Sequence, residues 1–151
     1  MERTFVMVKP NGVERTLVGE IIKRIERKGL EINALKILLV SKEQAEKHYD
    51  VHQNKPFFQE LVQYICSGPV VAMVVSGNNS VEIMRLLAGA TDPTKSQPGT
   101  IRGDFSSDIR LNLIHTADTV ERAKYEISIY FNENEIIDYK RAIDKHTFTK
   151  E

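Results

Sequence analysis

A histidine near the three-quarter point of the chain has the setting of a nucleophile. His115 ends a short apolar stretch, and Asp118 with Glu121 forms a capping box, which predicts that a helix starts just after His115. The unpaired N–H groups at a helix start favour anions, and a neutral imidazole is nucleophilic near neutral pH. These residues allow phosphoryl chemistry at His115, and they allow an exposed histidine at a strand end equally well.

The glycine-rich phosphate loops are absent from the sequence. Neither G-x-x-x-x-G-K-[ST] nor G-x-G-x-x-G occurs, so a phosphate site would have to be built from side chains. The candidates follow predicted strands or lie near loops: Lys9, Arg85, Thr91, Arg102 and His115. Each cation has a structural alternative. Lys9 could mark a strand end, the stem of Arg85 could cover an apolar helix face, and Arg102 could be a solvated loop residue.

Two further side chains could complete such a site. Glu126 lies at the edge of the apolar face of a predicted helix, where a carboxylate needs a partner. An imidazole N–H of His115 would serve and would fix its tautomer, and an exposed pair with Arg122 is the alternative. Of the adjacent Phe57 and Phe58, only one can point inward from a helix. The other could stack on a base or pack between the core and a neighbouring element.

The other histidines and the single cysteine indicate no site. His48 and His52 are four residues apart, but no carboxylate at matching spacing completes a zinc motif, so no zinc site is expected. His146 and these two histidines are interpreted as ordinary. Cys66 excludes an intrachain disulfide and is expected to be a small buried hydrophobe.

Length and charge favour one domain over residues 1–151, with enough chain for a substantial core. Lys plus Arg and Asp plus Glu number 21 each, so no overall basic field indicates a dedicated nucleic-acid site. The N-terminus lacks the apolar core of a signal peptide, and no apolar stretch approaches the roughly 18–20 residues that cross a bilayer. We therefore expect a cytoplasmic protein without a membrane segment.

Apolar patterning predicts the elements that position these residues. Strands are predicted at 4–9, 30–40 and 69–75, with a short one leading into His115. Helices are predicted at 17–28, 41–49, 57–66, 80–88 and 119–131, two of them opened by the capping boxes Ser41–Gln44 and Asn79–Glu82. Residues 89–111 form a long loop, which is usually functional, and 133–143 form a polar tail with some helical potential.

This order of elements is typical of an α+β fold, the ferredoxin-like βαββαβ sandwich, in which helices cover a four-stranded antiparallel sheet. A small doubly wound α/β sheet is the alternative. Four strands with two main crossover helices fit the first better.

Five segments together resemble the nucleoside diphosphate kinase family, over Thr4 to about Tyr139. They are V-K-P-N-G-V from Val8, K-P-F-F from Lys55, S-G-P-V-V-A-M from Ser67, P-G-T-I-R-G-D-F from Pro98, and N-L-I-H-T-A-D-T from Asn112. One such motif could arise by chance, but five in the family's order and spacing could hardly do so.

The resemblance implies a ferredoxin-like domain that moves the γ-phosphoryl group of a nucleoside triphosphate, typically ATP, to a nucleoside diphosphate such as GDP. It implies a ping-pong reaction through a phosphohistidine at His115. Mg²⁺ would be carried by the nucleotide phosphates rather than by protein ligands, and base specificity would be broad. Relatives assemble as homohexamers or homotetramers, so a homo-oligomer is expected.

The resemblance also implies a role for individual residues. The phosphates would be held by Lys9, Arg85, Thr91 and Arg102. Asn112 would contact the sugar hydroxyl, and Phe57 would stack on the base with Ile109 on its other side. Tyr49 and Glu126 would position His115. Because His115 must be neutral to attack, activity is expected to fall as the pH drops through its pKa, near 6.5 if unperturbed.

The chain departs from the family's usual H-G-S-D-S signature, since it has H-T-A-D-T from His115. Ala117 removes a hydroxyl beside the nucleophile, a loss of about 1 kcal/mol if it costs one hydrogen bond. Positions 106–111 also differ. Neither change touches His115 or the phosphate-holding residues, so activity is expected to survive.

Two other classes of protein compete with a kinase. A non-catalytic nucleotide-binding module would be favoured by the loss of His115 or of a phosphate-holding cation, but all are present. A ferredoxin-like RNA-binding module would need exposed aromatic residues on its strands, and the strands here are aliphatic.

Overall fold

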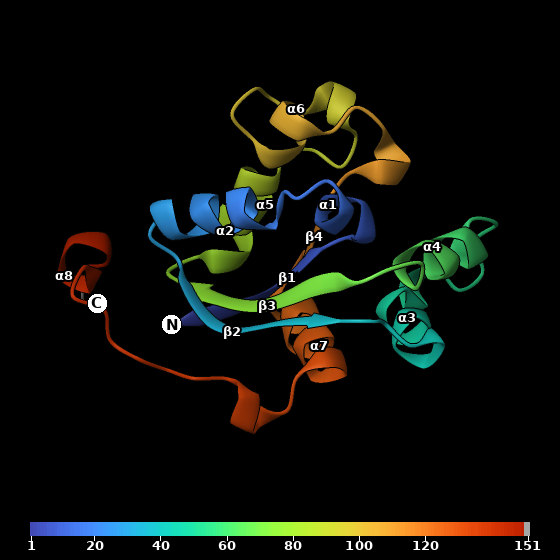
Figure 1. Ribbon diagram of the computed structural model, residues 1–151. Coiled ribbons are helices and arrows are strands. Elements are labelled where there is room, and N and C mark those ends of the chain that lie inside the picture. Colours follow the sequence, from blue (N-terminus) through green and yellow to red (C-terminus); the bar gives the residue numbers. More distant parts are fainter. Residues whose placement is uncertain (150–151) are drawn as a thin grey trace.

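The structure, a computed structural model that describes residues 1–149, is built around one antiparallel sheet (Figure 1). Its strands are β1 (Glu2–Val8), β2 (Glu31–Leu38), β3 (Val70–Gly77) and β4 (Ile114–Thr116), in the spatial order β2-β3-β1-β4. All neighbouring strands run antiparallel. The predicted ferredoxin-like sandwich is confirmed, and the doubly wound alternative is wrong because it needs parallel neighbours.

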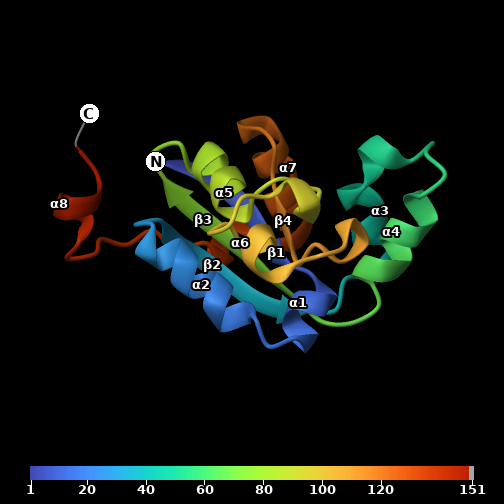
Figure 2. The ribbon, with the colours of Figure 1, turned by 90° about the horizontal axis from the view of Figure 1, so that it is seen from above.

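Helices cover both faces of the sheet (Figures 1 and 2). One layer contains α1 (Pro10–Glu14), α2 (Val18–Arg27), α5 (Ser80–Ala88) and α6 (Ile101–Phe105). The other layer contains α3 (Lys42–His48), α4 (Phe58–Ile65) and α7 (Val120–Tyr130). In Figure 2, α3 and α4 lie side by side at one end of the sheet, and the C-terminal α8 (Asp144–Thr147) lies at the other.

The two central strands contain continuous apolar runs, at residues 5–8 and 70–75, because both of their faces are covered there. Phe5 and Met7 of β1 belong to the core beneath α7, whereas Val6 and Val8 belong to the core beneath α2 and α5. Every residue of β3 is buried. The continuous apolar runs in the sequence therefore match strands that separate two cores.

Most predicted boundaries agree with the structure to within a few residues. The Ser41–Gln44 capping box opens α3 as predicted. Gly29 follows α2 with a φ of 95°, a left-handed conformation that favours glycine at a helix end. Phe58 is buried and Phe57 is 44 % exposed, so one ring of the pair faces inward and the other outward.

The predicted cap of α7 is wrong by one residue. Thr119 is the N-cap, and its hydroxyl accepts a hydrogen bond from the backbone amide of Arg122 at 3.0 Å. Asp118 and Glu121 therefore form no capping box. His115 lies within β4, where it pairs with Met7, and not at the first turn of the helix.

The predicted cap of α5 is also wrong. Asn79 has a left-handed conformation with a φ of 57°, and its side chain makes no capping hydrogen bond. The carboxylate of Glu2 takes this role, since it accepts a hydrogen bond from the amide of Val81 at 2.8 Å. The start of β1 therefore holds the start of α5.

The 89–111 segment and the polar tail contain more or different helix than expected. Residues 89–111, predicted as a loop, contain α6 and the 3₁₀ turns Pro93–Lys95 and Ile109–Leu111. In the polar tail, only Glu133–Glu135 forms a helical turn, and α8 falls after the predicted 133–143 segment. Within residues 1–149, no helix is both long and apolar enough to pass through a membrane.

Candidate active site

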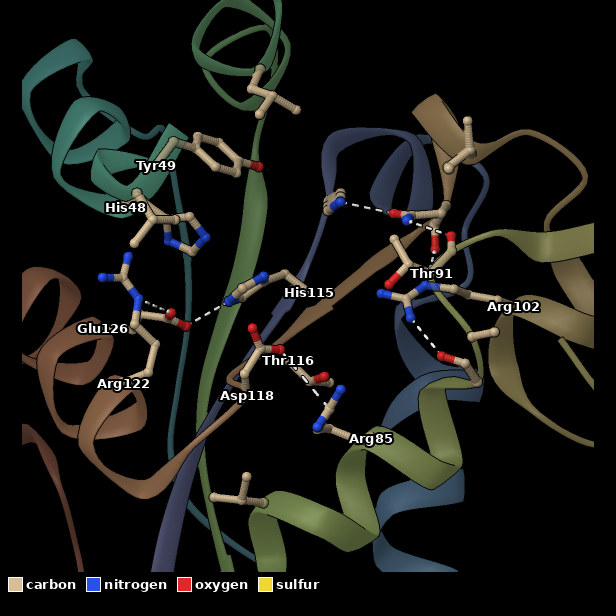
Figure 3. Close-up of a pocket in the computed structure, with 18 of the residues that line it drawn as sticks. His48, Tyr49, Arg85, Thr91, Arg102, His115, Thr116, Asp118, Arg122 and Glu126 are labelled. Atoms are coloured by element: carbon tan, nitrogen blue, oxygen red, sulfur yellow. Dashed lines mark hydrogen bonds and ion pairs between the residues drawn. The ribbon is translucent and has the colours of Figure 1, made fainter. Parts of the chain in front are cut away.

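A cavity of about 1550 Å³ opens where the two helical layers meet above β1 and β4 (Figure 3). It is lined by side chains of α3, α4, α5, α7 and the 89–112 segment. All nine residues proposed from the sequence line it, together with Ile109: Lys9, Tyr49, Phe57, Arg85, Thr91, Arg102, Asn112, His115 and Glu126. Side chains separated by more than 100 positions in the chain thus share one cavity.

His115 is held from behind by a buried carboxylate. Its Nε2 lies 2.5 Å from Oε1 of Glu126, which is 2 % exposed (Figure 3). A carboxylate accepts a hydrogen bond, so this contact favours the tautomer with the proton on Nε2. Nδ1 then keeps a free lone pair, which is the arrangement of an oriented nucleophile.

The sequence left Glu126 with two alternative partners, and the structure gives it both. One carboxylate oxygen contacts His115, and the other accepts a hydrogen bond from Nε of Arg122 at 2.8 Å. Desolvation raises the pKa of Glu126, while the Arg122 cation opposes that rise.

Lys9 and Arg102 bring positive charge into the interior of the cavity. Lys9 follows β1, and its ammonium donates a hydrogen bond to Oδ1 of Asn112 at 2.8 Å. Burial, reinforced by the charge of Arg102, lowers the pKa of Lys9 to about 7. Burial also lowers the pKa of Arg102, to about 10. The Lys9 shift combines burial with repulsion by a neighbouring cation, whereas the Arg102 shift comes from burial and is opposed by the Asp118 carboxylate.

Arg102 is a buried residue of α6 and not a solvated loop residue. It is 7 % exposed and donates hydrogen bonds to the carbonyls of Gly89 and Ile114, both at 2.7 Å. A third, longer bond of 3.3 Å reaches the carbonyl of Asn112. These carbonyls fix the guanidinium at the cavity wall.

Arg85 and Thr91 line the same side of the cavity as Arg102 (Figure 3). Arg85 projects from α5, is mostly exposed, and lies 3.9 Å from the carboxylate of Asp118 (Figure 3). Thr91 follows the end of α5, and its backbone carbonyl accepts a hydrogen bond from the side-chain amide (Nδ2) of Asn112 at 3.1 Å. Asn112 therefore links Lys9 to the Thr91 segment.

The outer part of the cavity is apolar. Phe57, at the N-cap of α4, and Ile109 are about half exposed. Both line the cavity, and the Lys55 ammonium lies 5.6 Å from the centre of the Phe57 ring. A flat apolar group of a ligand could be covered here, while its charged part reaches the cations within.

Tyr49 and His48 approach His115 from the end of α3. Tyr49 is buried, and desolvation raises the pKa of its hydroxyl. The ring of His48 meets that of His115 edge to face with centroids 4.4 Å apart, and its Nδ1 lies 3.1 Å from the Tyr130 hydroxyl. Its Nε2 has no hydrogen-bond partner among residues 1–149.

Sequence reasoning missed His48, which it interpreted as ordinary. Its ring groups with His115 and Glu126, with ligand atoms within 4.8 Å of one another, and not with His52. The available signal was helical spacing, because His48 lies three residues after Ala45 and both face the core. Cys66, expected to be buried, is only partly buried.

Comparison with known proteins shows which family the chain belongs to. The family model described as nucleoside diphosphate kinase matches residues 2–136. The chain belongs to the nucleoside diphosphate kinase family. It is an enzyme of that class, since relatives with this name match it at high identity.

The relatives of this nucleoside diphosphate kinase family member cover almost its whole length. The nucleoside diphosphate kinase of Picrophilus torridus is 59 % identical over 138 residues, 91 % of this chain and 100 % of that protein. That of Archaeoglobus fulgidus is 56 % identical over 142 residues, 94 % of each chain. The structure of the Halobacterium salinarum enzyme in complex with CDP has a TM-score of 0.95 at 44 % identity, and covers 98 % of this chain and 99 % of that one.

The surroundings of His115 change the pH dependence expected for a nucleoside diphosphate kinase with an unperturbed histidine. Burial, with the charges of Lys9 and Arg102, lowers the pKa of His115 to about 3. A histidine with a lowered pKa stays neutral until the pH falls to that pKa, so the fall in activity expected near pH 6.5 should be absent. A histidine with a pKa of 6.5 would lose about tenfold in neutral form between pH 7.5 and 5.5.

We predict that an NMR titration of the His115 ring shows no protonation between pH 7.5 and 5.5. The rate of protein labelling by ATP should accordingly show no tenfold loss that follows a histidine titration. A His115 midpoint near pH 6.5 would contradict the prediction.

Proposed function

We propose that the enzyme transfers the γ-phosphoryl group of a nucleoside triphosphate to a nucleoside diphosphate through a phosphohistidine at His115. The observation that carries the proposal is the 2.5 Å contact between His115 Nε2 and Glu126, which leaves Nδ1 as the nucleophile in a cation-lined cavity. The name and the bound CDP of the Halobacterium salinarum relative support nucleotide as the ligand.

The reaction takes place in two in-line displacements. In the first, the Nδ1 lone pair attacks the γ-phosphorus, an N–P bond forms, and the P–O bond to the β-phosphate breaks, so that a nucleoside diphosphate leaves. In the second, a terminal phosphate oxygen of another diphosphate attacks the same phosphorus. The N–P bond breaks, and its electron pair returns to Nδ1. Nε2 keeps its proton, which it donates in a hydrogen bond to Glu126, in both steps.

The surrounding residues neutralise the charge that spreads over the phosphoryl oxygens. Lys9, Arg85 and Arg102 supply cations, and Thr91 supplies a hydroxyl. Asn112 would exchange its bond with Lys9 for a sugar hydroxyl when nucleotide enters. Phe57 and Ile109 would cover the two faces of the base. Stacking reads a flat ring rather than a hydrogen-bond pattern, which favours broad base specificity.

The residues of this site fit a Mg²⁺ ion that is bound by the nucleotide phosphates. Within residues 1–149, three side chains lie close enough together to hold a metal ion: His48, His115 and Glu126. Two of the three are imidazoles, which do not suit a hard cation such as Mg²⁺. Mg²⁺ usually binds to substrate phosphates with one or two carboxylates. The exposed Asp118 carboxylate at the cavity is available for that contact. The ion would supply charge neutralisation between the phosphates.

The proposed intermediate is directly measurable by mass. Brief exposure to Mg·ATP should add one phosphoryl group to the intact protein, and GDP should remove it with formation of GTP. The adduct should be stable in alkali but be lost in mild acid, as expected of phosphohistidine. GTP formation without a covalent adduct at any time point, including rapid-quench samples, would contradict the ping-pong reaction.

We also propose that the chain forms a homo-oligomer. Strand β2 is an edge of the sheet, and its exposed large apolar residues include Leu35 and Ile37, with Leu39 just beyond it. An exposed apolar sheet edge is a template for pairing with another chain. Its length and alternating pattern suit the same edge of a second copy.

Charge placed on this edge should weaken the assembly. The Ile37→Lys substitution is expected to lower the molar mass measured by light scattering, whereas the matched Ile143→Lys substitution in the exposed C-terminal tail should not. An unchanged molar mass for Ile37→Lys would show that the subunits meet at another surface. A monomeric wild-type protein would contradict the proposed homo-oligomer.

A further inference from the structure

The carboxylate behind His115 depends on an arginine that lies one helical turn away. Glu126 is 2 % exposed, and burial of a lone carboxylate disfavours its charged form. Nε of Arg122 donates a hydrogen bond to Glu126 Oε2 at 2.8 Å, on the oxygen that His115 does not use (Figure 3). Both oxygens of the carboxylate are therefore engaged, one by the nucleophile and one by the arginine.

Arg122 is itself held on its other sides by the end of α3 and the turn that follows it. One terminal nitrogen donates to the Asp50 carboxylate at 2.9 Å, and the other donates to the His48 carbonyl at 2.6 Å. The guanidinium also lies 4.6 Å from the centre of the Tyr125 ring. Because all three nitrogens already have partners, Arg122 is not arranged to bind a phosphate.

The result is a chain of contacts from the end of α3 to the reacting nitrogen. It runs from Asp50 to Arg122, then to Glu126, and then to Nε2 of His115. The charged and titratable groups around Glu126 are Arg122 from its own helix, His115 from β4, His48 and Tyr49 from α3 and its end, Asp50 from the following turn, and Tyr130. Among these groups, Arg122 is the cation in contact with the carboxylate.

The contact between Arg122 and Glu126 also explains how the site accommodates Ala117. The sequence predicted that the hydroxyl missing at this position would cost a hydrogen bond that supports His115. Ala117 is fully buried within an apolar core. The polar support behind His115 comes instead from Glu126 and Arg122. No free carboxylate oxygen remains that needs a hydroxyl partner.

We propose that Arg122 is a positioning residue for phosphoryl transfer. It keeps Glu126 ionised and oriented, and Glu126 in turn keeps the proton of His115 on Nε2 and the lone pair on Nδ1. Arg122 acts through these two residues and not through the nucleotide. The inference rests on the proposed phosphohistidine reaction.

The test compares variants of Arg122 with variants of a matched arginine. Arg141 is 16 % exposed, against 21 % for Arg122, and is likewise held by several partners: Asp144 and the carbonyls of Gly29 and Leu30. It lies on the C-terminal tail, outside the residues that line the cavity. Arg122→Gln and Arg141→Gln therefore both remove a multiply bonded guanidinium, but only the first removes it from behind Glu126.

Arg122→Gln should lower kcat by roughly 10- to 100-fold, which is typical for the loss of a residue that orients a reacting ligand. KM for the nucleotide should stay within about twofold, since uniform binding is not removed. Loss of the cation raises the pKa of Glu126 further, so the remaining activity should rise with pH over a range where the wild type is flat. Arg141→Gln should show neither change.

Guanidinium ion at millimolar concentration gives a second readout that a folding defect would not produce. It should restore part of kcat to Arg122→Ala and none to Arg141→Ala, while Arg122→Lys should retain intermediate activity. Unchanged kcat in Arg122→Gln, a change in KM alone, or equal losses in both arginine series without rescue would each overturn the proposal. Absence of a phosphohistidine in the wild type would instead refute the reaction on which it rests.

Discussion

Replacing His115 with alanine is expected to abolish both protein labelling by ATP and formation of GTP from GDP. The alanine removes the imidazole nitrogen that forms the N–P bond in the proposed reaction. Loss of a covalent nucleophile typically lowers kcat by a factor of about 10⁴ or more. Transfer of ³²P from ATP to the protein, followed on denaturing gels at high pH, measures the first effect directly.

The control for this experiment is His146→Ala, in the C-terminal α8 and outside the cavity, which should label like the wild type. His48 and His52 also line the cavity and could in principle carry a phosphoryl group. Labelling of either residue in the His115→Ala protein at the wild-type rate would refute the assignment of the nucleophile.

Replacing Lys9 with methionine should have opposite effects on activity and stability. Methionine fills a similar volume but removes a cation that faces the transferred phosphoryl group in the proposed reaction. Loss of one preorganised electrostatic contact typically costs a factor of about 10²–10³ in kcat. At the same time, the protein loses a buried charge whose pKa is depressed to about 7.

The sign of the stability effect follows from that pKa. The folded protein binds the Lys9 proton more weakly than the unfolded chain, so the charge destabilises the fold at about pH 7 and below. The penalty decreases as the pH rises toward the unfolded value of 10.5. We expect Lys9→Met to gain about 1–3 kcal/mol at pH 7, because one pKa unit corresponds to about 1.4 kcal/mol and the lost bond to Asn112 offsets part of it.

Urea denaturation at pH 7 and at pH 10 would measure this gain, which should shrink at the higher pH. Lys36→Met is the control, because Lys36 forms a partly exposed pair with Glu135 and is not among the residues that line the cavity. A Lys9→Met protein that is both inactive and less stable at pH 7 would show that the lysine stabilises the fold.

The sequence predicted the sheet well because each strand is specified locally. The runs at 5–8 in β1 and 70–75 in β3 are apolar at every position, a pattern typical of a strand that is covered on both faces. Helix caps were less predictable, because a cap depends on geometry as well as on residue type. Glu2, far from α5 in sequence, replaced Asn79, since the two meet only after β1 and β3 pair.

The candidate site was predicted residue by residue through the family resemblance, and the structure adds what a single sequence pattern does not contain. Periodicity places Glu126 on a helix edge, but it does not show that Arg122 and His115 engage different oxygens. Nor does it show that Lys9 and Arg102 lie in the same cavity as His115. For this reason the lowered pKa of His115 was not predicted from the sequence. Charge interactions of this kind depend on distances across the fold.

The bond from Glu2 to the start of α5 couples the first strand of the sheet to the helix that carries Arg85. Glu2 lies 79 positions before Val81, whose amide it holds, so no local pattern in the sequence of α5 contains this support. A substitution at Glu2 would therefore loosen the start of α5 and shift Arg85 at the cavity, although Glu2 lies far from Arg85 in the sequence.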